Sequence, residues 1–202
     1  MKNLFLLSFI TVFFLTSGCS DDTDDTPQIE ELTQQEKDDL LFIREEEKLA
    51  RDVYLYAYDL YGERTFTNIA NSEQTHMDKV LTLIDTYNLS DPASSERGVF
   101  LNQELQGLYN DLTAQVDISL VDAFKVGATI EDLDIRDIEE FEDRTDKTDI
   151  IAAYDLLRCG SRNHMRSYDN QLSLLGINYI PQFISQDEFD EIVNSQNERC
   201  GQ

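Results

Sequence analysis

Four long stretches of this chain carry apolar residues in alternating steps of three and four, the spacing of one buried face of an α-helix. They cover residues 34–61, residues 66–87, a stretch that opens at Ser119, and residues 149–175. Only 8 glycines and 3 prolines occur in 202 residues, too few for the many turns of a β-sandwich. The sequence therefore predicts an all-α fold with one packed core.

Capping signals mark the helix ends. Thr33 and Glu36 form the pattern of a capping box, and Gly62 is a typical helix stop. Ser119 and Asp122 form a variant of the same box at the start of the third helix. These signals predict that the first helix spans 34–61 and that the third begins just after Ser119.

The connections predict how the helices are arranged. A long segment, Asn88 to Ile118, separates the second helix from the third and contains a predicted short helix from Asn102 to Ala114. A connection of this length allows the two flanking helices to run parallel. The sequence therefore predicts a four-helix bundle with a long crossover and a C-terminal extension that holds a further helix at 186–195.

Ionisable residues interrupt the apolar face of every predicted long helix. A buried carboxylate without a partner costs several kcal/mol, so an interior that holds several of them needs a source of positive charge. Divalent cations would supply it, and carboxylate oxygens with imidazole nitrogens suit iron or manganese better than a thiolate-selected ion. The candidate metal ligands are Glu47, Glu73, His76, Glu131, Asp134 and His164.

Simpler interpretations exist for each motif alone. A lone histidine on an apolar face is usually a core residue, and the Glu131–Asp134 pair alone would fit a solvated acidic patch. The chain has only 2 histidines, however, and both fall on inward faces, which favours a metal centre. Glu45, Glu46 and the acids of 139–149 are rotated away from the helix stripes, so they are predicted to face solvent.

Four sequence motifs extend this hypothesis. EKLARDVY at 47–54 resembles the first-helix pattern of rubrerythrin-type ferritin-like proteins. REEEKLARDVY at 44–54, NIANSEQTHM at 68–77, VGATIEDLDI at 126–135 and GSRNHMRSY at 160–168 resemble a prokaryotic ferritin-like family of unknown function. The resemblance covers about Glu36 to Val193. It implies a ferritin-like four-helix bundle in which the same six residues bind iron or manganese.

The resemblance also implies oxidoreductase chemistry on oxygen, peroxide or the metal itself. Ser161 stands where the di-iron pattern has a glutamate, which leaves open whether the centre holds one ion or two. Arg51, Arg162 and Asn163 flank the ligands as candidate hydrogen-bond partners, although a surface role fits Arg162 equally well. The alternative function is a non-catalytic cell-envelope bundle that binds a structural cation or a protein partner.

The N-terminus reads as an export signal. Lys2 and the apolar run from Leu4 to Leu15 have the composition and length of a signal peptide. LTSGC at 15–19 resembles a bacterial lipobox. It predicts a lipoprotein signal at 1–18, lipidation of Cys19, an acidic tether at 19–32 and a helical domain at 33–202. Ordinary cleavage near Gly18, with Cys19 left as a free thiol, is the alternative.

This resemblance implies a lipid-anchored protein of the cell envelope, attached to the outer membrane and, by the SDD sequence at 20–22, exposed at the surface. The formal net charge of -25 excludes nucleic acid as a partner. Cys159 and Cys200 remain as either a disulfide or two free thiols. A homodimer is compatible with the sequence, although no exposed apolar face demands it.

Overall fold

The computed structural model describes residues 31–201, which form six α-helices without a strand. The helices are α1 (Gln34–Tyr61), α2 (Arg64–Thr86), α3 (Gln103–Val116), α4 (Leu120–Glu142), α5 (Thr148–Leu174) and α6 (Gln186–Asn194). The predicted all-α class is confirmed, and every predicted helix is present. The predicted signal peptide, Cys19 and the tether up to residue 30 lie outside the described residues. No helix within 31–201 is long and apolar enough to cross a membrane.

The helix ends follow the capping chemistry of the sequence. The Thr33 hydroxyl accepts a hydrogen bond from the Glu36 amide, and the Glu36 carboxylate accepts one from the Thr33 amide. Gly62 ends α1 in the left-handed region at φ 70°, which a residue with a Cβ rarely adopts. Ser119 caps α4 through the amide of Asp122.

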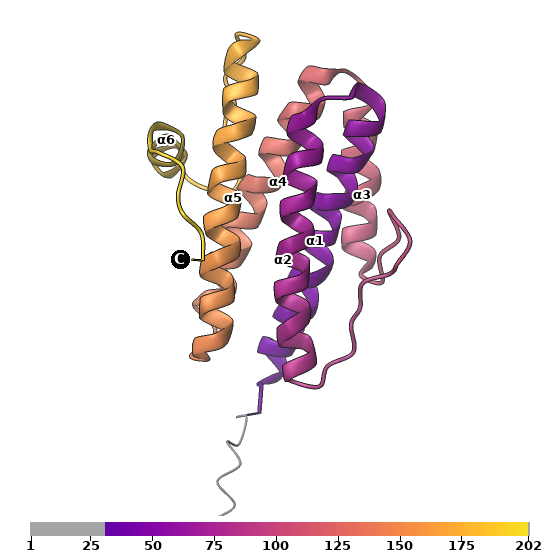
Figure 1. The fold of residues 1–202 in the computed structure, drawn as a ribbon, viewed down its shortest axis with the longest axis vertical. Coiled ribbons are helices and arrows are strands. Elements are labelled where there is room, and N and C mark those ends of the chain that lie inside the picture. Colours follow the sequence, from indigo (N-terminus) through magenta and orange to yellow (C-terminus); the bar gives the residue numbers. More distant parts are fainter. Residues whose placement is uncertain (1–30, 202) are drawn as a thin grey trace, which may run out of the picture. The chain divides into compact units, whose positions relative to one another are not determined.

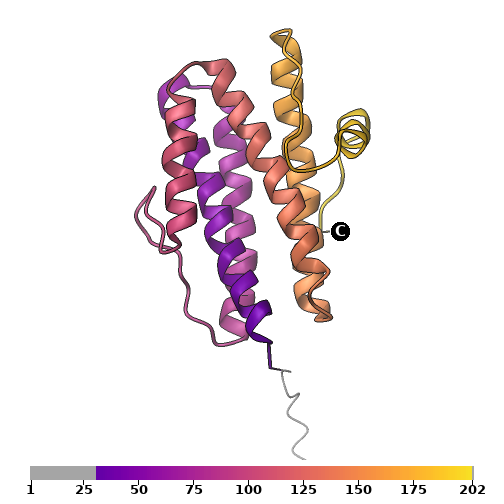
Figure 2. The same cartoon turned by 180° about the vertical axis from the view of Figure 1, so that it is seen from behind.

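The helices pack in two close pairs. α1 lies against α2, and α4 lies against α5. The crossover from the end of α2 leads to α3, which runs back along α1 before the chain turns into α4, so α2 and α4 run in the same direction (Figure 1). Seen from behind, α3 lies beside α1, and α6 lies on the outer side of α5 (Figure 2). The predicted parallel course of the second and third long helices is confirmed.

The core consists of two apolar clusters with a polar level between them. One contains Tyr54, Phe66, Phe124 and Tyr168. The other contains Leu40, Ile43, Val80, Ile84, Ile138 and Leu157. Each of α1, α2, α4 and α5 contributes to both clusters. On α1, α2 and α5 the candidate ligands fall between the two contributions, and on α4 they lie beside Ile130 and Ile135, near the end of the first cluster. The fold therefore places these ligands at one height in the interior. Leu32, at the end of the predicted tether, is also buried in the second cluster.

A second polar face of α1 holds the crossover in place. The Glu45 carboxylate accepts hydrogen bonds from the amides of Leu101 and Asn102. Lys48, fully buried, donates to Asp52 and to the carbonyl of Glu96, and Arg44 pairs with Asp91. The predicted exposure of Glu45 is wrong, because the crossover covers the side of α1 on which it lies.

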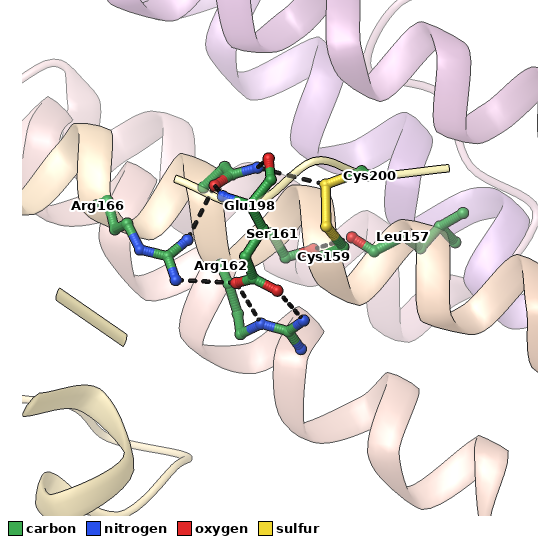
Figure 3. Close-up of a disulfide and its surroundings, with 8 residues drawn as sticks. Leu157, Cys159, Ser161, Arg162, Arg166, Glu198 and Cys200 are labelled. Atoms are coloured by element: carbon green, nitrogen blue, oxygen red, sulfur yellow. Dashed lines mark hydrogen bonds and ion pairs between the residues drawn. A yellow bond between two sulfur atoms is a disulfide. The ribbon is translucent and has the colours of Figure 1, made fainter. Parts of the chain in front are cut away.

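The tail after α6 is fastened to α5. Cys159 and Cys200 form a disulfide with their Cα atoms 5.6 Å apart, so the disulfide alternative for these cysteines holds. Next to it, the Glu198 carboxylate binds the guanidinium groups of Arg162 and Arg166 (Figure 3). The covalent bond and the ion pairs together hold residues 195–200 along the outer side of α5.

One contact between helices depends on a glycine. A Cβ built at Gly127 of α4 would lie 2.4 Å from the ring of Tyr168, which is fully buried on α5. Gly127→Ala should lower the free energy of unfolding by about 1–3 kcal/mol, because the clash outweighs the helix propensity gained. Urea denaturation measures this change.

Gly107 of α3 provides the matched control for this substitution. A Cβ there meets no atom within 4 Å, so Gly107→Ala should stabilise the protein by up to about 1 kcal/mol through helix propensity alone. Equal effects of the two substitutions would contradict the close packing of α4 on α5.

Candidate metal centre

Five of the six predicted ligands converge at the polar level of the core. Glu47 comes from α1, Glu73 and His76 from α2, Glu131 from α4 and His164 from α5. All five are buried, and the most exposed of them, His164, shows only 7% of its surface. Their nitrogen and oxygen atoms form two groups, in each of which the atoms lie within 4.8 Å of one another.

The first group contains Glu47, Glu73 and His76. Nδ1 of His76 lies 3.1 Å from Oε2 of Glu47 and 2.8 Å from Oε2 of Glu73. The three-residue spacing of Glu73 and His76 on α2 places both side chains on one face of the helix, one turn apart.

The second group contains Glu73, Glu131 and His164. Nδ1 of His164 lies 2.9 Å from Oε1 of Glu73 and 3.4 Å from Oε2 of Glu131. The two imidazole rings lie 5.6 Å apart and nearly parallel. Glu73 therefore belongs to both groups, with Oε2 facing His76 and Oε1 facing His164, the arrangement of a carboxylate that bridges two ions.

Several donor atoms of the two groups are buried and close together. Among the described residues, Nδ1 of His164 and Oε1 of Glu73 lie 2.9 Å apart and have no further hydrogen-bond partner. Oε1 of Glu47 is likewise buried and has no hydrogen-bond partner within residues 31–201. In each group the donor atoms lie close enough together to bind one ion. These donors, all oxygen or nitrogen, fit a divalent ion such as iron or manganese.

The electrostatics of the site also call for a cation. Burial raises the pKa of Glu47 to about 7, although His76 opposes the shift. Burial and repulsion by Glu73 raise the pKa of Glu131 to about 7. Burial would lower the pKa of His164, but the carboxylates of Glu73 and Glu131 raise it to about 10. The interior thus concentrates negative charge that protons or metal ions must balance.

Asp134, the sixth predicted ligand, lies outside both groups. It is buried and accepts a hydrogen bond from the Ser161 hydroxyl of α5. Burial, and then the charges of Glu47 and Glu131, raise its pKa well above the usual value. Asp134 therefore borders the centre and adds to its negative potential, while Ser161 orients its carboxylate.

Two neighbours of the ligands were not singled out by the sequence pattern. The Tyr54 hydroxyl donates a 2.5 Å hydrogen bond to Oε1 of Glu131 and so fixes the position of that carboxylate. Gly160 leaves room for His76, because a Cβ at this position would lie 2.4 Å from Nε2 of the imidazole. For Gly160 the sequence offered one signal, a glycine inside a predicted helix next to a ligand motif.

Other predicted neighbours have different partners. Arg51 binds Asp52 and Gln74, and Arg162 binds Glu198. Asn163 donates to the carbonyl of Glu198. None of these contacts within residues 31–201 reaches a candidate ligand. The arginines therefore stabilise the helix pair and the tail.

The predicted exposure of Glu46 is wrong. Its side chain is 2% exposed, because it points at α4, where Asp134 and Asp137 lie. The acidic residues between 139 and 149 are exposed or half-buried, as predicted.

Three comparisons with known proteins point to the same family. Residues 36–196 match the family model described as an uncharacterized protein domain, DUF2202. The uncharacterized protein MJ0754 of Methanocaldococcus jannaschii is 50% identical over 169 residues, which are 83% of this chain and 91% of that protein. The crystal structure of hypothetical protein MJ0754 from Methanococcus jannaschii matches with a TM-score of 0.83 and 49% identity, over 84% of this chain and 98% of that one. By model, sequence and structure, the chain belongs to the DUF2202 family.

Proposed function

We propose that this protein is a ferritin-like metalloprotein that binds a pair of iron or manganese ions between α1, α2, α4 and α5. Glu47 and His76 would hold one ion, Glu131 and His164 the other, and Glu73 would bridge them. The observation that carries the proposal is that two buried groups of donor atoms share Glu73, whose carboxylate oxygens lie 2.8 Å from Nδ1 of His76 and 2.9 Å from Nδ1 of His164.

The charge of the interior supports two ions rather than one. Two divalent ions carry as much positive charge as the carboxylates of Glu47, Glu73, Glu131 and Asp134 carry negative charge. The two histidines would then bind through Nδ1 and as neutral imidazoles, because a protonated imidazole cannot bind a metal ion. A lone structural cation would leave part of this buried charge without a counter-charge.

Bound ions of this kind supply redox chemistry toward a small oxidant such as oxygen or peroxide. The surrounding side chains position the ligands and limit the access of water. Tyr54 holds Glu131 in place, Ser161 holds Asp134, and the two apolar clusters exclude water above and below the ligands. This arrangement supports an oxidoreductase role rather than a surface cation site.

Metal titration tests the proposal. Purified protein freed of metal and titrated with Mn²⁺ should bind about two ions per chain, with the spin coupling of a bridged pair in its electron paramagnetic resonance spectrum. His76→Ala and His164→Ala should each remove one ion and the coupling. Glu139→Gln, an exposed acid on α4, is the control and should bind as the wild type does. Failure of the wild type to bind Mn²⁺ or Fe²⁺ would refute the proposed centre.

A further inference from the structure

An acidic pocket opens near the beginning of α1 and the end of α4. Its volume is about 520 Å³, and its wall includes Asp137 and Arg136 of α4 beside Phe141. The other acidic residues that line it are Asp38, Asp39, Glu45 and Glu104. Carboxylates that line a concave surface raise the local concentration of cations. The pocket is thus suited to collect divalent ions from solution.

Acidic side chains on α4 lead from this pocket to the metal centre. Glu131, Asp134 and Asp137 follow one another at three-residue intervals, each step rising about 4.5 Å along the helix. Glu131 belongs to the centre, Asp134 lies beside it, and Asp137 lines the pocket. The three carboxylates therefore form a continuous series on one side of α4.

Glu46 faces this series from α1. Glu46 is 2% exposed, and the part of the chain that the structure describes places no hydrogen-bond donor at either of its carboxylate oxygens. The charged neighbours that act on it most strongly are Asp137 and Asp134, followed by Glu47. A buried carboxylate whose charged neighbours are other carboxylates costs several kcal/mol unless a proton or a cation neutralises its charge. A cation in the space between α1 and α4 would neutralise Glu46 during part of the protein's cycle.

Asp137 has a partner that can be exchanged. Arg136 pairs with it, and the half-exposed Arg136 side chain also lies over the ring of Phe183. An arriving divalent ion can replace this guanidinium at the pocket wall without leaving a charge buried. In the described part of the chain, Glu46 and Asp134 form no ion pair with a basic residue, so an ion at these inner steps has no competing counter-charge.

We propose that Asp137, Glu46 and Asp134 form a transfer path along which divalent metal ions pass from the acidic pocket to the buried centre. The proposal rests on the proposed metal centre. It assigns a function to carboxylates that are not ligands, and it predicts that they control the rate of metal uptake and leave the final occupancy unchanged.

Stopped-flow loading with Co²⁺ tests the path through the visible absorbance of the bound ion. Glu46→Gln and Asp137→Asn should each slow loading by about tenfold or more, while the occupancy reached at saturating Co²⁺ equals that of the wild type. Glu46→Asp, which keeps the charge, should restore most of the rate. The control is Glu104→Gln, which removes a charge from an exposed residue of the same pocket and leaves Asp137, Glu46 and Asp134 unchanged. This variant should load Co²⁺ at close to the wild-type rate.

Three outcomes would overturn the path. Loading rates of Glu46→Gln and Asp137→Asn within a factor of about two of the wild type would show that ions enter elsewhere. Loss of final occupancy in Glu46→Gln would make Glu46 part of the centre itself. Absence of Co²⁺ binding in the wild type would refute the proposed centre and the path together, whereas failure of the path alone leaves wild-type binding intact. Circular dichroism of each variant confirms that the helices are formed.

Discussion

Glu73→Gln should weaken metal binding at both positions of the centre, by about 100-fold or more at each. Glu73 directs one carboxylate oxygen toward His76 and the other toward His164. Glutamine keeps the size of the side chain but removes its charge. It also replaces one carboxylate oxygen with an NH₂ group, which does not bind a cation. No other residue belongs to both groups of donors within residues 31–201.

Glu47→Gln and Glu131→Gln provide the comparison for this prediction, since each affects one group alone. Mn²⁺ titrations followed by isothermal calorimetry should show one weakened position in each of these variants and two in Glu73→Gln. Glu140→Gln, a half-exposed acid of α4 that pairs with Arg144, is the surface control. Wild-type affinity at either position in Glu73→Gln would contradict the bridging role of this carboxylate.

Cys200→Ser should lower the free energy of unfolding by about 4 kcal/mol on the chain-entropy model of disulfides. The bond joins residues 41 positions apart, so it restricts a long loop of the unfolded chain. In the folded state it holds the tail beside the ion pairs of Glu198 with Arg162 and Arg166 (Figure 3). Disulfides persist in oxidising compartments, which agrees with the predicted export of the protein.

Urea denaturation with and without a reductant measures this contribution. Reduced wild-type protein should unfold at the same urea concentration as Cys200→Ser, and the variant should not respond to the reductant. Glu198→Gln, which leaves the disulfide intact, should cost much less, because partly exposed ion pairs contribute about 1 kcal/mol or less. Equal stability of oxidised wild type and Cys200→Ser would contradict the prediction.

The helices and the inward positions of the ligands could be predicted because both depend on local periodicity. Thr33 and Gly62 act within one turn of their helix, and Glu73 and His76 face the same direction whatever surrounds α2. Once the four stripes were assigned, burial of the acids on them followed from the geometry of a helix. The meeting of Glu73 with His164 also depends on the packing of α2 against α5, whereas the long crossover indicated only that α2 and α4 run parallel.

The burial of Glu45 and Glu46 could not be predicted in the same way. Both lie off the apolar stripe, and their environment is created by segments far away in the sequence, the loop at 101–102 for Glu45 and α4 for Glu46. Asp132 is a similar case, because its carboxylate accepts hydrogen bonds from the amides of residues 182–184. Helix periodicity says where a side chain points but not which distant segment covers it.

The first helix limits how this protein can change during evolution. Successive residues of α1 face different neighbours. Glu45 and Lys48 bind the crossover, Glu46 lies beside α4, and Glu47 belongs to the candidate metal centre. One inserted or deleted residue would rotate everything beyond it by about 100° around the helix axis. Every later side chain would then meet the wrong neighbour. Divergence along this stretch must therefore proceed by replacement at fixed length, even where insertions elsewhere in the chain are tolerated.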